Sequence, residues 1–204
     1  MQGAPTGGTR FLSLKYLASF EQLLHTIDAH AIERITTCLD DARERGATIY
    51  VAGNGGSAAI ASHWANDLGK ATKCPGRPSI RVMCLSDNVS WLTALANDEG
   101  YERVFVGQLE NFARRGDVLA VISSSGNSPN LIRAVELARD RGLTTIGLVG
   151  FDGGALKNLV YETLWVATEK GAYALVEPAH LMVCHLVTTC LAAAPVRGVG
   201  TGAA

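Results

Sequence analysis

The chain has 204 residues, of which 48% are hydrophobic and 18% are charged. This composition is typical of one globular domain with a sizeable core, and it excludes an intrinsically disordered chain. Eighteen Lys and Arg residues against 19 Asp and Glu residues leave a net charge of -1. No basic surface for nucleic acid is therefore predicted.

Cysteine usage and hydropathy predict a cytoplasmic protein without a membrane span. The five cysteines are an odd number without a C-x-x-C pair, which is typical of a reducing compartment. Residues Met1–Thr9 lack the apolar core of a secretory signal peptide. The longest weakly polar stretch, Leu181–Ala194, falls short of the roughly 20 residues that cross a bilayer.

Two amphipathic helices are predicted ahead of any strand. Apolar residues recur at helical spacing from Phe11 to Leu24 and again from Ile27 to Ala42. Such apolar faces have to pack on the domain or on another subunit, so an oligomer is expected. Residues 1–9 and 195–204 are rich in small residues and are predicted to be flexible tails. Residues 10–194 are predicted to form a single domain whose helical extension covers residues 10–46.

Five short apolar or β-branched runs predict strands, and helical patterns lie between most of them. The strands are expected at Thr48–Ala52, Ile80–Leu85, Val118–Ile122, Thr145–Val149 and Glu162–Val166, and the helices at Ala58–Lys70, Leu92–Ala96, Glu102–Ala113, Asn130–Arg141 and Pro178–Ala193. This alternation predicts an α/β fold, a three-layer α/β/α sandwich around a parallel sheet. Ligands of such sheets bind beyond the carboxyl ends of the strands.

The first strand runs into a glycine-rich loop that opens directly into a helix. Small residues from Gly53 to Ser57 let backbone N–H groups approach a ligand, and the helix N-terminus adds positive potential, as in phosphate sites. Gly53, Gly55 and Ala58 also satisfy the dinucleotide pattern G-x-G-x-x-G/A. The acidic residue expected about 20 positions later is absent, which weighs against dinucleotide binding.

A second loop of this kind follows the third strand, with four serines and a glycine between Ser123 and Ser128. Serine hydroxyls can donate to phosphate oxygens, and Ser128-Pro129 is typical of a helix N-cap followed by the first helical residue. Two such loops at the same edge of one sheet point to a phosphorylated small molecule.

These two loops resemble those of the sugar isomerase (SIS) domain family, in particular its phosphoheptose isomerase branch. The likeness covers about residues 11–194 and includes Asn97-Asp98 and residues 150–154. It implies a Rossmann-like sheet of five parallel strands and a homotetramer with active sites between subunits. The implied reaction converts the ketose sedoheptulose 7-phosphate to the aldose D-glycero-D-manno-heptose 7-phosphate or a close analogue. The substrate contacts that the resemblance implies fall on Asn54, Gly55, Gly56, Ser57, Asn97, Asp98, Ser123, Ser124, Ser125, Ser128 and Glu177.

Aldose–ketose isomerisation passes through an enediol and needs an acid and a base, roles that carboxylate and imidazole can fill. His63 and Asp67 stand four residues apart and share a helix face. Glu177 and His185 are eight residues apart, about 80° around an ideal helix. His180 is interpreted as a packing or interface residue. By resemblance, His63, Asp67, Glu177 and His185 would hold Zn²⁺, and Asp67 and His185 would be the catalytic pair for proton transfer.

Two positions depart from the family pattern, which has Glu at the position of Asp67 and Gln at that of Glu177. These departures suggest a branch with a different sugar phosphate. The alternative function is a non-catalytic SIS domain that binds sugar phosphates as an adaptor or regulator, as in the replication-initiator-associating proteins. Because those adaptors lack the acid–base pair, Asp67 and His185 favour an enzyme.

Overall fold

The computed structural model describes residues 8–195. Its elements are α1 (Thr9–Leu24), α2 (Ala29–Glu44), β1 (Thr48–Gly53), α3 (Gly56–Lys70), β2 (Arg81–Cys84), α4 (Val89–Asp98), the 3₁₀ turn η1 (Tyr101–Arg103), α5 (Val106–Phe112), β3 (Val118–Ser123), α6 (Pro129–Asp140), β4 (Thr144–Val149), α7 (Leu156–Leu159), β5 (Glu162–Trp165) and α8 (Tyr173–Ala193). Most of residues 1–9 and 195–204, the predicted tails, lie outside the described residues.

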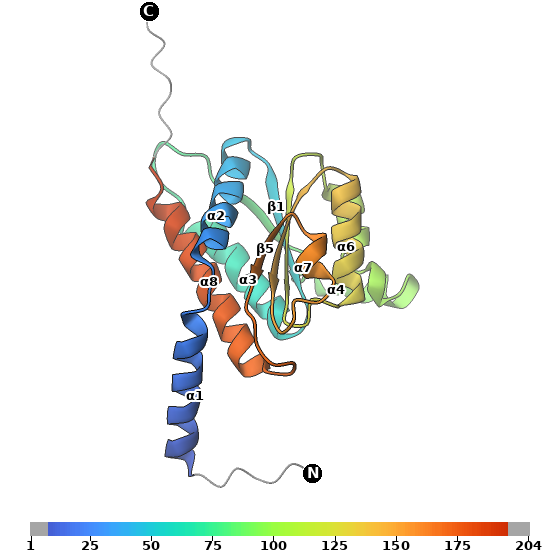
Figure 1. Cartoon of the computed structure of the whole chain (residues 1–204). Helices are drawn as coiled ribbons and strands as arrows, with labels where there is room; N and C mark the ends of the chain where they lie inside the picture. The colour runs from blue at the N-terminus through green and yellow to red at the C-terminus, as the bar shows by residue number, and fades with distance from the viewer. Residues whose placement is uncertain (1–7, 196–204) are drawn as a thin grey trace, which may run out of the picture.

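All five strands are parallel and lie in the order β2-β1-β3-β4-β5, between two layers of helices (Figure 1). This confirms the predicted α/β sandwich. The central strand β3 is buried along its whole length, which explains why its sequence is a continuous apolar run rather than an alternating one. Polar residues therefore lie in the loops beyond the strand ends. Because β1 and β3 are adjacent and parallel, their loops lie at the same edge of the sheet.

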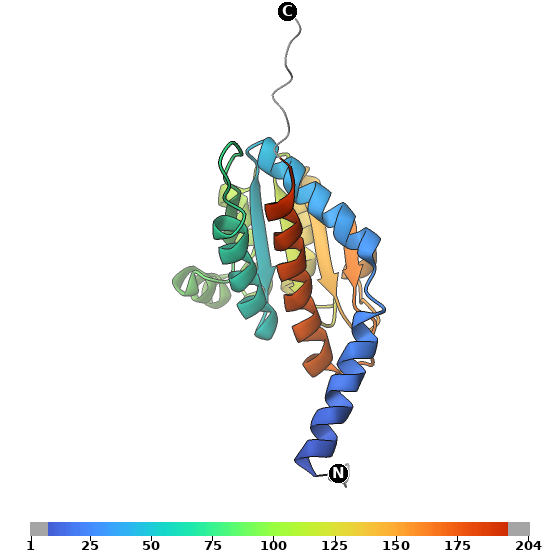
Figure 2. The same cartoon turned by 90° about the vertical axis from the view of Figure 1, so that its left-hand side faces the viewer.

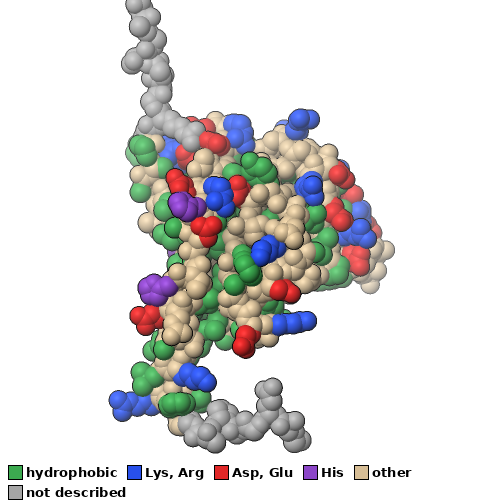
Figure 3. Space-filling model, viewed as in Figure 1, with side chains coloured by type: hydrophobic (Ala, Val, Ile, Leu, Met, Phe, Trp, Pro, Cys, Tyr) green, Lys and Arg blue, Asp and Glu red, His purple; other side chains and the backbone are tan. Residues whose placement is uncertain are grey.

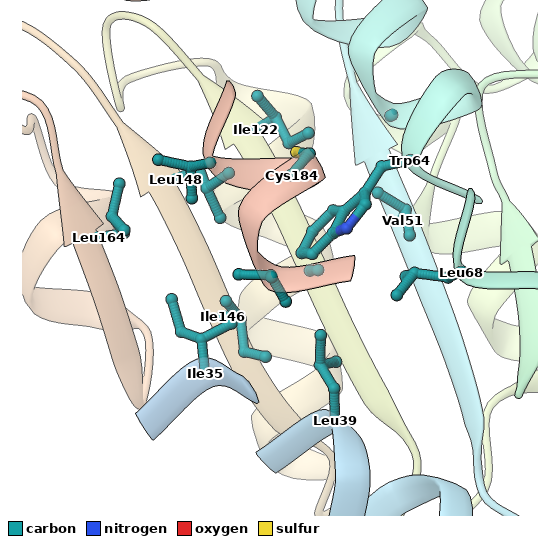
Figure 4. Packing of buried hydrophobic residues seen from close by; sticks show 14 of the residues in the cluster. Ile35, Leu39, Val51, Trp64, Leu68, Ile122, Ile146, Leu148, Leu164 and Cys184 are labelled. Carbon is teal, nitrogen blue, oxygen red and sulfur yellow. The ribbon is translucent and has the colours of Figure 1, made fainter. Parts of the chain in front are cut away.

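Alternate residues of each central strand enter two separate cores. Figure 4 shows one of them, in which Trp64 of α3 and Cys184 of α8 meet Val51 of β1 and Ile146 of β4. Helices α2, α3 and α8 cover this face of the sheet, while α4, α5, α6 and α7 pack on the other face. Fully burying an indole such as that of Trp64 contributes several kcal/mol to folding, so α3 and α8 are held firmly against the sheet.

Helix α8 begins five residues earlier than predicted. The sequence places Pro178 at the first helical position, but the helix starts at Tyr173 and contains Pro178 in its interior. A proline has no N–H, so it cannot donate to the carbonyl four residues back, which belongs to Ala174. The Tyr16 hydroxyl of α1 donates to that carbonyl at 2.8 Å instead. The helix thus continues through the proline, with one of its carbonyls bonded from outside.

Helix α8 is longer than the weakly polar stretch Leu181–Ala194, which was expected to be too short to cross a bilayer. This 21-residue helix is long and apolar enough to cross a membrane by length and composition alone, and 44% of its most apolar window is buried inside the structure. Its apolar face packs against α2 and α3, and it carries His180 and His185. Core packing accounts for the apolar composition of the buried face.

Helix α1 extends away from the sheet beside the start of α8, as Figure 2 shows. Its apolar side chains are largely exposed, with Phe11 at 61%, Leu14 at 58% and Leu17 at 59%. In Figure 3, hydrophobic and charged side chains are mixed along this projecting helix, as acidic and basic groups are over the rest of the visible face. The described part of the chain leaves this apolar face of α1 without a partner of its own.

Candidate functional site

The loop from β1 to α3 is shaped by two glycines. Gly55 is the N-cap of α3 and has φ 54° and ψ −124°, a conformation that a residue with a Cβ rarely adopts. A Cβ on Gly53 would lie 2.4 Å from the backbone oxygen of Ser57, so only glycine lets the strand end approach the helix this closely. The loop therefore carries backbone N–H groups and the buried Ser57 at the positive end of α3.

The serine loop from β3 to α6 is held by bonds to its own backbone. Ser123 Oγ accepts the Gly126 N–H at 3.0 Å, and Ser125 Oγ accepts the Asn127 N–H at 3.2 Å. The Ser124 hydroxyl is buried and has no hydrogen-bond partner within the described residues. Ser128 is the N-cap of α6 with Pro129 in its first turn, as predicted, but its side chain makes no capping bond. Ser124 and Ser128 thus leave hydroxyls for a ligand.

A third loop, after β4, supports the serine loop from behind. The Leu156 N–H donates to the Gly126 carbonyl at 3.0 Å, and the Ala155 N–H donates to Asn127 Oδ1 at 3.0 Å. Gly126 has φ 63°, and a Cβ there would lie 2.0 Å from the Gly153 oxygen. Residues 150–154 were predicted from resemblance alone, because nothing local in that segment reveals that it packs against the serine loop.

The first two loops line one pocket of about 310 Å³, to which the start of α8 contributes Tyr173 and Glu177. It contains Asn54, Gly55, Gly56, Ser57, Ser123, Ser124, Ser125, Ser128 and Glu177 of the predicted substrate site, together with Ile122, Leu131 and Tyr173, which sequence reasoning missed. No Lys or Arg is among the described lining residues, so an anion would be bound by hydroxyls, backbone N–H groups and helix N-termini.

Glu177 is the one charged side chain among the described residues that line this pocket. A Cβ on Gly56 would lie 2.6 Å from both carboxylate oxygens of Glu177, so the carboxylate packs directly on the backbone at the start of α3. This position suits a carboxylate because it is the positive end of a helix. Here the starts of α3 and α8 meet, and the two helices continue side by side in the same direction.

Further along these helices, His63, Asp67 and His185 come together. Asp67 Oδ2 lies 3.3 Å from His63 Nε2 and 3.1 Å from His185 Nδ1, and the two imidazole rings meet edge to face with centroids 4.9 Å apart. One ligand atom from each residue lies within 4.8 Å of the other two. Both histidines are about half exposed and the carboxylate is 17% exposed, so the cluster is open to a substrate.

The structure brings together three of the four predicted metal-site residues. Glu177 lies at the start of α8, about 12 Å along the helix axis from His185 at 1.5 Å per residue, and is not part of the described cluster. Asn97 and Asp98 end α4, where Asn97 Nδ2 donates to Asp98 Oδ1 at 2.7 Å. They are not among the described residues that line the pocket.

His180 is a buried packing residue in the described chain, with 0% exposure. Neither ring nitrogen has a hydrogen-bond partner of good geometry among the described residues. Burial lowers the pKa of His180 to about 4, despite a weak opposing effect of the Val149 backbone. Burial, with a smaller contribution from the Asp67 carboxylate, also raises the pKa of the Cys184 thiol. Both groups are therefore neutral near pH 7 and stay outside the chemistry of the cluster.

Comparison with known proteins agrees with this geometry. Residues 15–150 match the SIS domain family. A phosphoheptose isomerase from Nitratiruptor is 38% identical over 85% of this chain and 91% of its own length. The lincomycin biosynthesis protein LmbN of Streptomyces lincolnensis is 40% identical over 77% of this chain and 59% of its own length.

The fold also has close counterparts among solved structures. A phosphoheptose isomerase from Francisella tularensis superimposes with a TM-score of 0.81, at 26% identity, over 91% of this chain and 98% of its own. The SIS domain match over residues 15–150 and the 38% identity to the Nitratiruptor isomerase, covered over 91% of its length, establish the family. The chain belongs to the SIS domain family and, within it, to the phosphoheptose isomerases.

Proposed function

We propose that this isomerase interconverts sedoheptulose 7-phosphate and D-glycero-D-manno-heptose 7-phosphate or a close analogue. The observation that carries the proposal is the arrangement of two parallel helices. Both α3 and α8 start at a pocket suited to phosphate, and their later turns bring Asp67 between two imidazoles. The separation of about 12 Å along α8 between Glu177 and His185 favours a substrate with several carbons between its phosphate and its carbonyl.

In this proposal the serine loop and the first loop bind the phosphate. The hydroxyls of Ser124 and Ser128 donate to phosphate oxygens, and the N-termini of α3 and α6 stabilise the negative charge. Binding energy from this remote group orients the sugar chain along α3 and α8, which lowers the entropic part of the barrier. The phosphate itself takes no part in the reaction.

The reacting end of the sugar lies at Asp67 and His185 in this scheme. The Asp67 carboxylate accepts a proton from the carbon next to the carbonyl, and the enediol forms. His185 donates a proton to the carbonyl oxygen as the enediol forms, and takes one back from the neighbouring hydroxyl as the new carbonyl forms. Asp67 returns its proton to the former carbonyl carbon, which completes the isomerisation. The short Asp67–His185 contact of 3.1 Å lets the carboxylate orient the imidazole.

The cluster of His63, Asp67 and His185 also fits a metal ion. Imidazole and carboxylate are suitable zinc ligands, and three protein ligands leave a position open for a substrate oxygen, as in catalytic zinc sites. When bound, Zn²⁺ would polarise the sugar carbonyl as a Lewis acid. Glu177 is proposed as a substrate contact, because its carboxylate faces the start of α3 rather than this cluster.

We further propose a homotetramer of cytoplasmic location with active sites between subunits. The exposed apolar residues of α1, Phe11, Leu14 and Leu17, support association through that helix. All five cysteines are free thiols, in keeping with a reducing compartment. Light scattering coupled to gel filtration tests the assembly. A Leu14→Glu variant that remains tetrameric would contradict the role of α1.

The reaction is tested by incubating the purified protein with sedoheptulose 7-phosphate and following aldose formation, with chelator, without chelator, and after Zn²⁺ is added back. We expect turnover that falls on chelation and returns with the metal. Asp67→Asn and His185→Ala should each lower kcat by about 10²-fold or more. Absence of turnover on every sugar phosphate from five to eight carbons would instead favour the non-catalytic adaptor.

A further inference from the structure

Asn54 and Asn130 form a reciprocal pair of side-chain amides at the edge of the pocket. Asn54 Nδ2 donates to Asn130 Oδ1 at 2.9 Å, and Asn130 Nδ2 donates to Asn54 Oδ1 at 2.9 Å. Asn54 lies in the loop before α3, whereas Asn130 lies in the first turn of α6, directly after the serine loop. The pair therefore joins the two ligand loops through side chains.

Each amide oxygen of this pair accepts one further bond. The Leu131 backbone N–H donates to Asn130 Oδ1 at 3.0 Å, and the Tyr101 hydroxyl of η1 donates to Asn54 Oδ1 at 3.0 Å. Asn130 is only 2% exposed, so water cannot readily replace its bonds to Asn54 and to the Leu131 N–H. Exchanging the oxygen and nitrogen of either amide would set donor against donor or acceptor against acceptor. The Leu131 N–H can only donate, so it fixes the orientation of Asn130, and Asn130 in turn fixes that of Asn54. The Tyr101 hydroxyl then holds the Asn54 oxygen in place.

This arrangement decides what Asn54 can offer to a ligand. Both acceptor sites of its oxygen are occupied, by Tyr101 and Asn130. One of its two amide hydrogens goes to Asn130, and the other has no acceptor among the described residues. Because Asn54 lines the pocket, it can present one donor and no acceptor to a bound molecule.

We propose that Asn130 and Tyr101 are positioning residues, which hold the Asn54 amide so that its free N–H donates to an oxygen of the sugar chain. The inference rests on the proposed function, since it takes the ligand to be a sugar phosphate. It separates two tasks within one pocket. The serine loop binds the phosphate, and the Asn54 amide recognises a hydroxyl or carbonyl oxygen of the chain attached to it.

A double-mutant cycle between Tyr101 and Asn54 tests this inference. Tyr101→Phe, Asn54→Ala and the double variant are compared with the unaltered chain in their Kd for sedoheptulose 7-phosphate and in kcat/KM. If Tyr101 acts through Asn54, Tyr101→Phe should weaken binding about fivefold in the unaltered background and less than about twofold in the Asn54→Ala background. Tyr161→Phe, at an exposed tyrosine, is the matched control and should change neither value.

Inorganic phosphate supplies the second readout. As a competitive ligand of the serine loop, it should bind equally well to the unaltered chain and to Tyr101→Phe. Asn130→Asp keeps the shape of the buried side chain but removes its donor to Asn54. This variant should likewise weaken binding of the sugar phosphate more than binding of inorganic phosphate. Thermal melting verifies that each variant is folded.

Equal weakening by Tyr101→Phe in both backgrounds, or a parallel loss of phosphate affinity, would show a general structural role and overturn the inference. Turnover is scored separately. A chain that binds the sugar phosphate with the expected coupling but does not isomerise it would refute the proposed reaction and support the positioning network. A chain that binds no sugar phosphate would overturn both.

Discussion

Replacing His180 by leucine should remove a defined part of the acid sensitivity of the fold. The ordinary pKa of a histidine is 6.5, and burial lowers that of His180 to about 4 in the folded chain. Between these values the unfolded chain binds a proton that the folded chain does not, so stability falls as the pH drops from 6.5 toward 4. Linkage gives a loss of about 2 kcal/mol between pH 7.5 and pH 5.

Urea unfolding at these two pH values, at one protein concentration, measures this loss. The His180→Leu variant will have its own stability at pH 7.5, but its drop on going to pH 5 should be smaller than that of the unaltered chain by about 2 kcal/mol. His30→Gln is the control, because that side chain is 86% exposed, and it should keep the full drop. An equal drop in the His180→Leu variant would refute the reasoning.

Three further changes test other parts of the structure. Gly53→Ala places a Cβ 2.4 Å from a backbone oxygen in the first turn of α3 and should cost about 2 kcal/mol of unfolding free energy; an unchanged urea midpoint would show that the loop can yield. Tyr16→Phe leaves the Ala174 carbonyl without its donor and should lower the unfolding free energy by about 1 kcal/mol. The control Tyr161→Phe, at an exposed tyrosine, should change it little. Equal losses of stability in the two variants would contradict the role of this bond. Glu177→Gln removes the one carboxylate of the pocket, so inorganic phosphate should inhibit about fivefold more strongly, and weaker inhibition would mean that the carboxylate does not repel the anion.

Much of the fold follows from local sequence patterns. The β1 and β3 segments are apolar and end in glycine or serine before a helix, which is enough to predict a parallel sheet with two ligand loops at one edge. The start of α8 could not be predicted in this way. Pro178 looks like a helix start in the sequence, because it leaves the Ala174 carbonyl without its usual donor. In the structure the Tyr16 hydroxyl, from the distant helix α1, bonds that carbonyl and the helix continues through the proline.

The candidate site was predictable where partners lie on one helix and less so where they do not. His63 and Asp67 are one turn apart, so their contact follows from helix geometry. The meeting of His185 with Asp67 depends on how α8 packs beside α3. Asn130 looks in sequence like an ordinary first-turn residue, and only the tertiary approach of Asn54 reveals its amide pair.

The bond from Tyr16 to Ala174 has a consequence for how assembly and chemistry are connected. It attaches the projecting first helix to the opening turn of the helix that carries both Glu177 and His185. A neighbouring subunit that packs on the apolar side of α1 would therefore also stabilise the opening turn of the helix that carries those two side chains. If the chain assembles through α1 as proposed, dissociation by dilution should loosen that turn first, and turnover should be lost before any helix content.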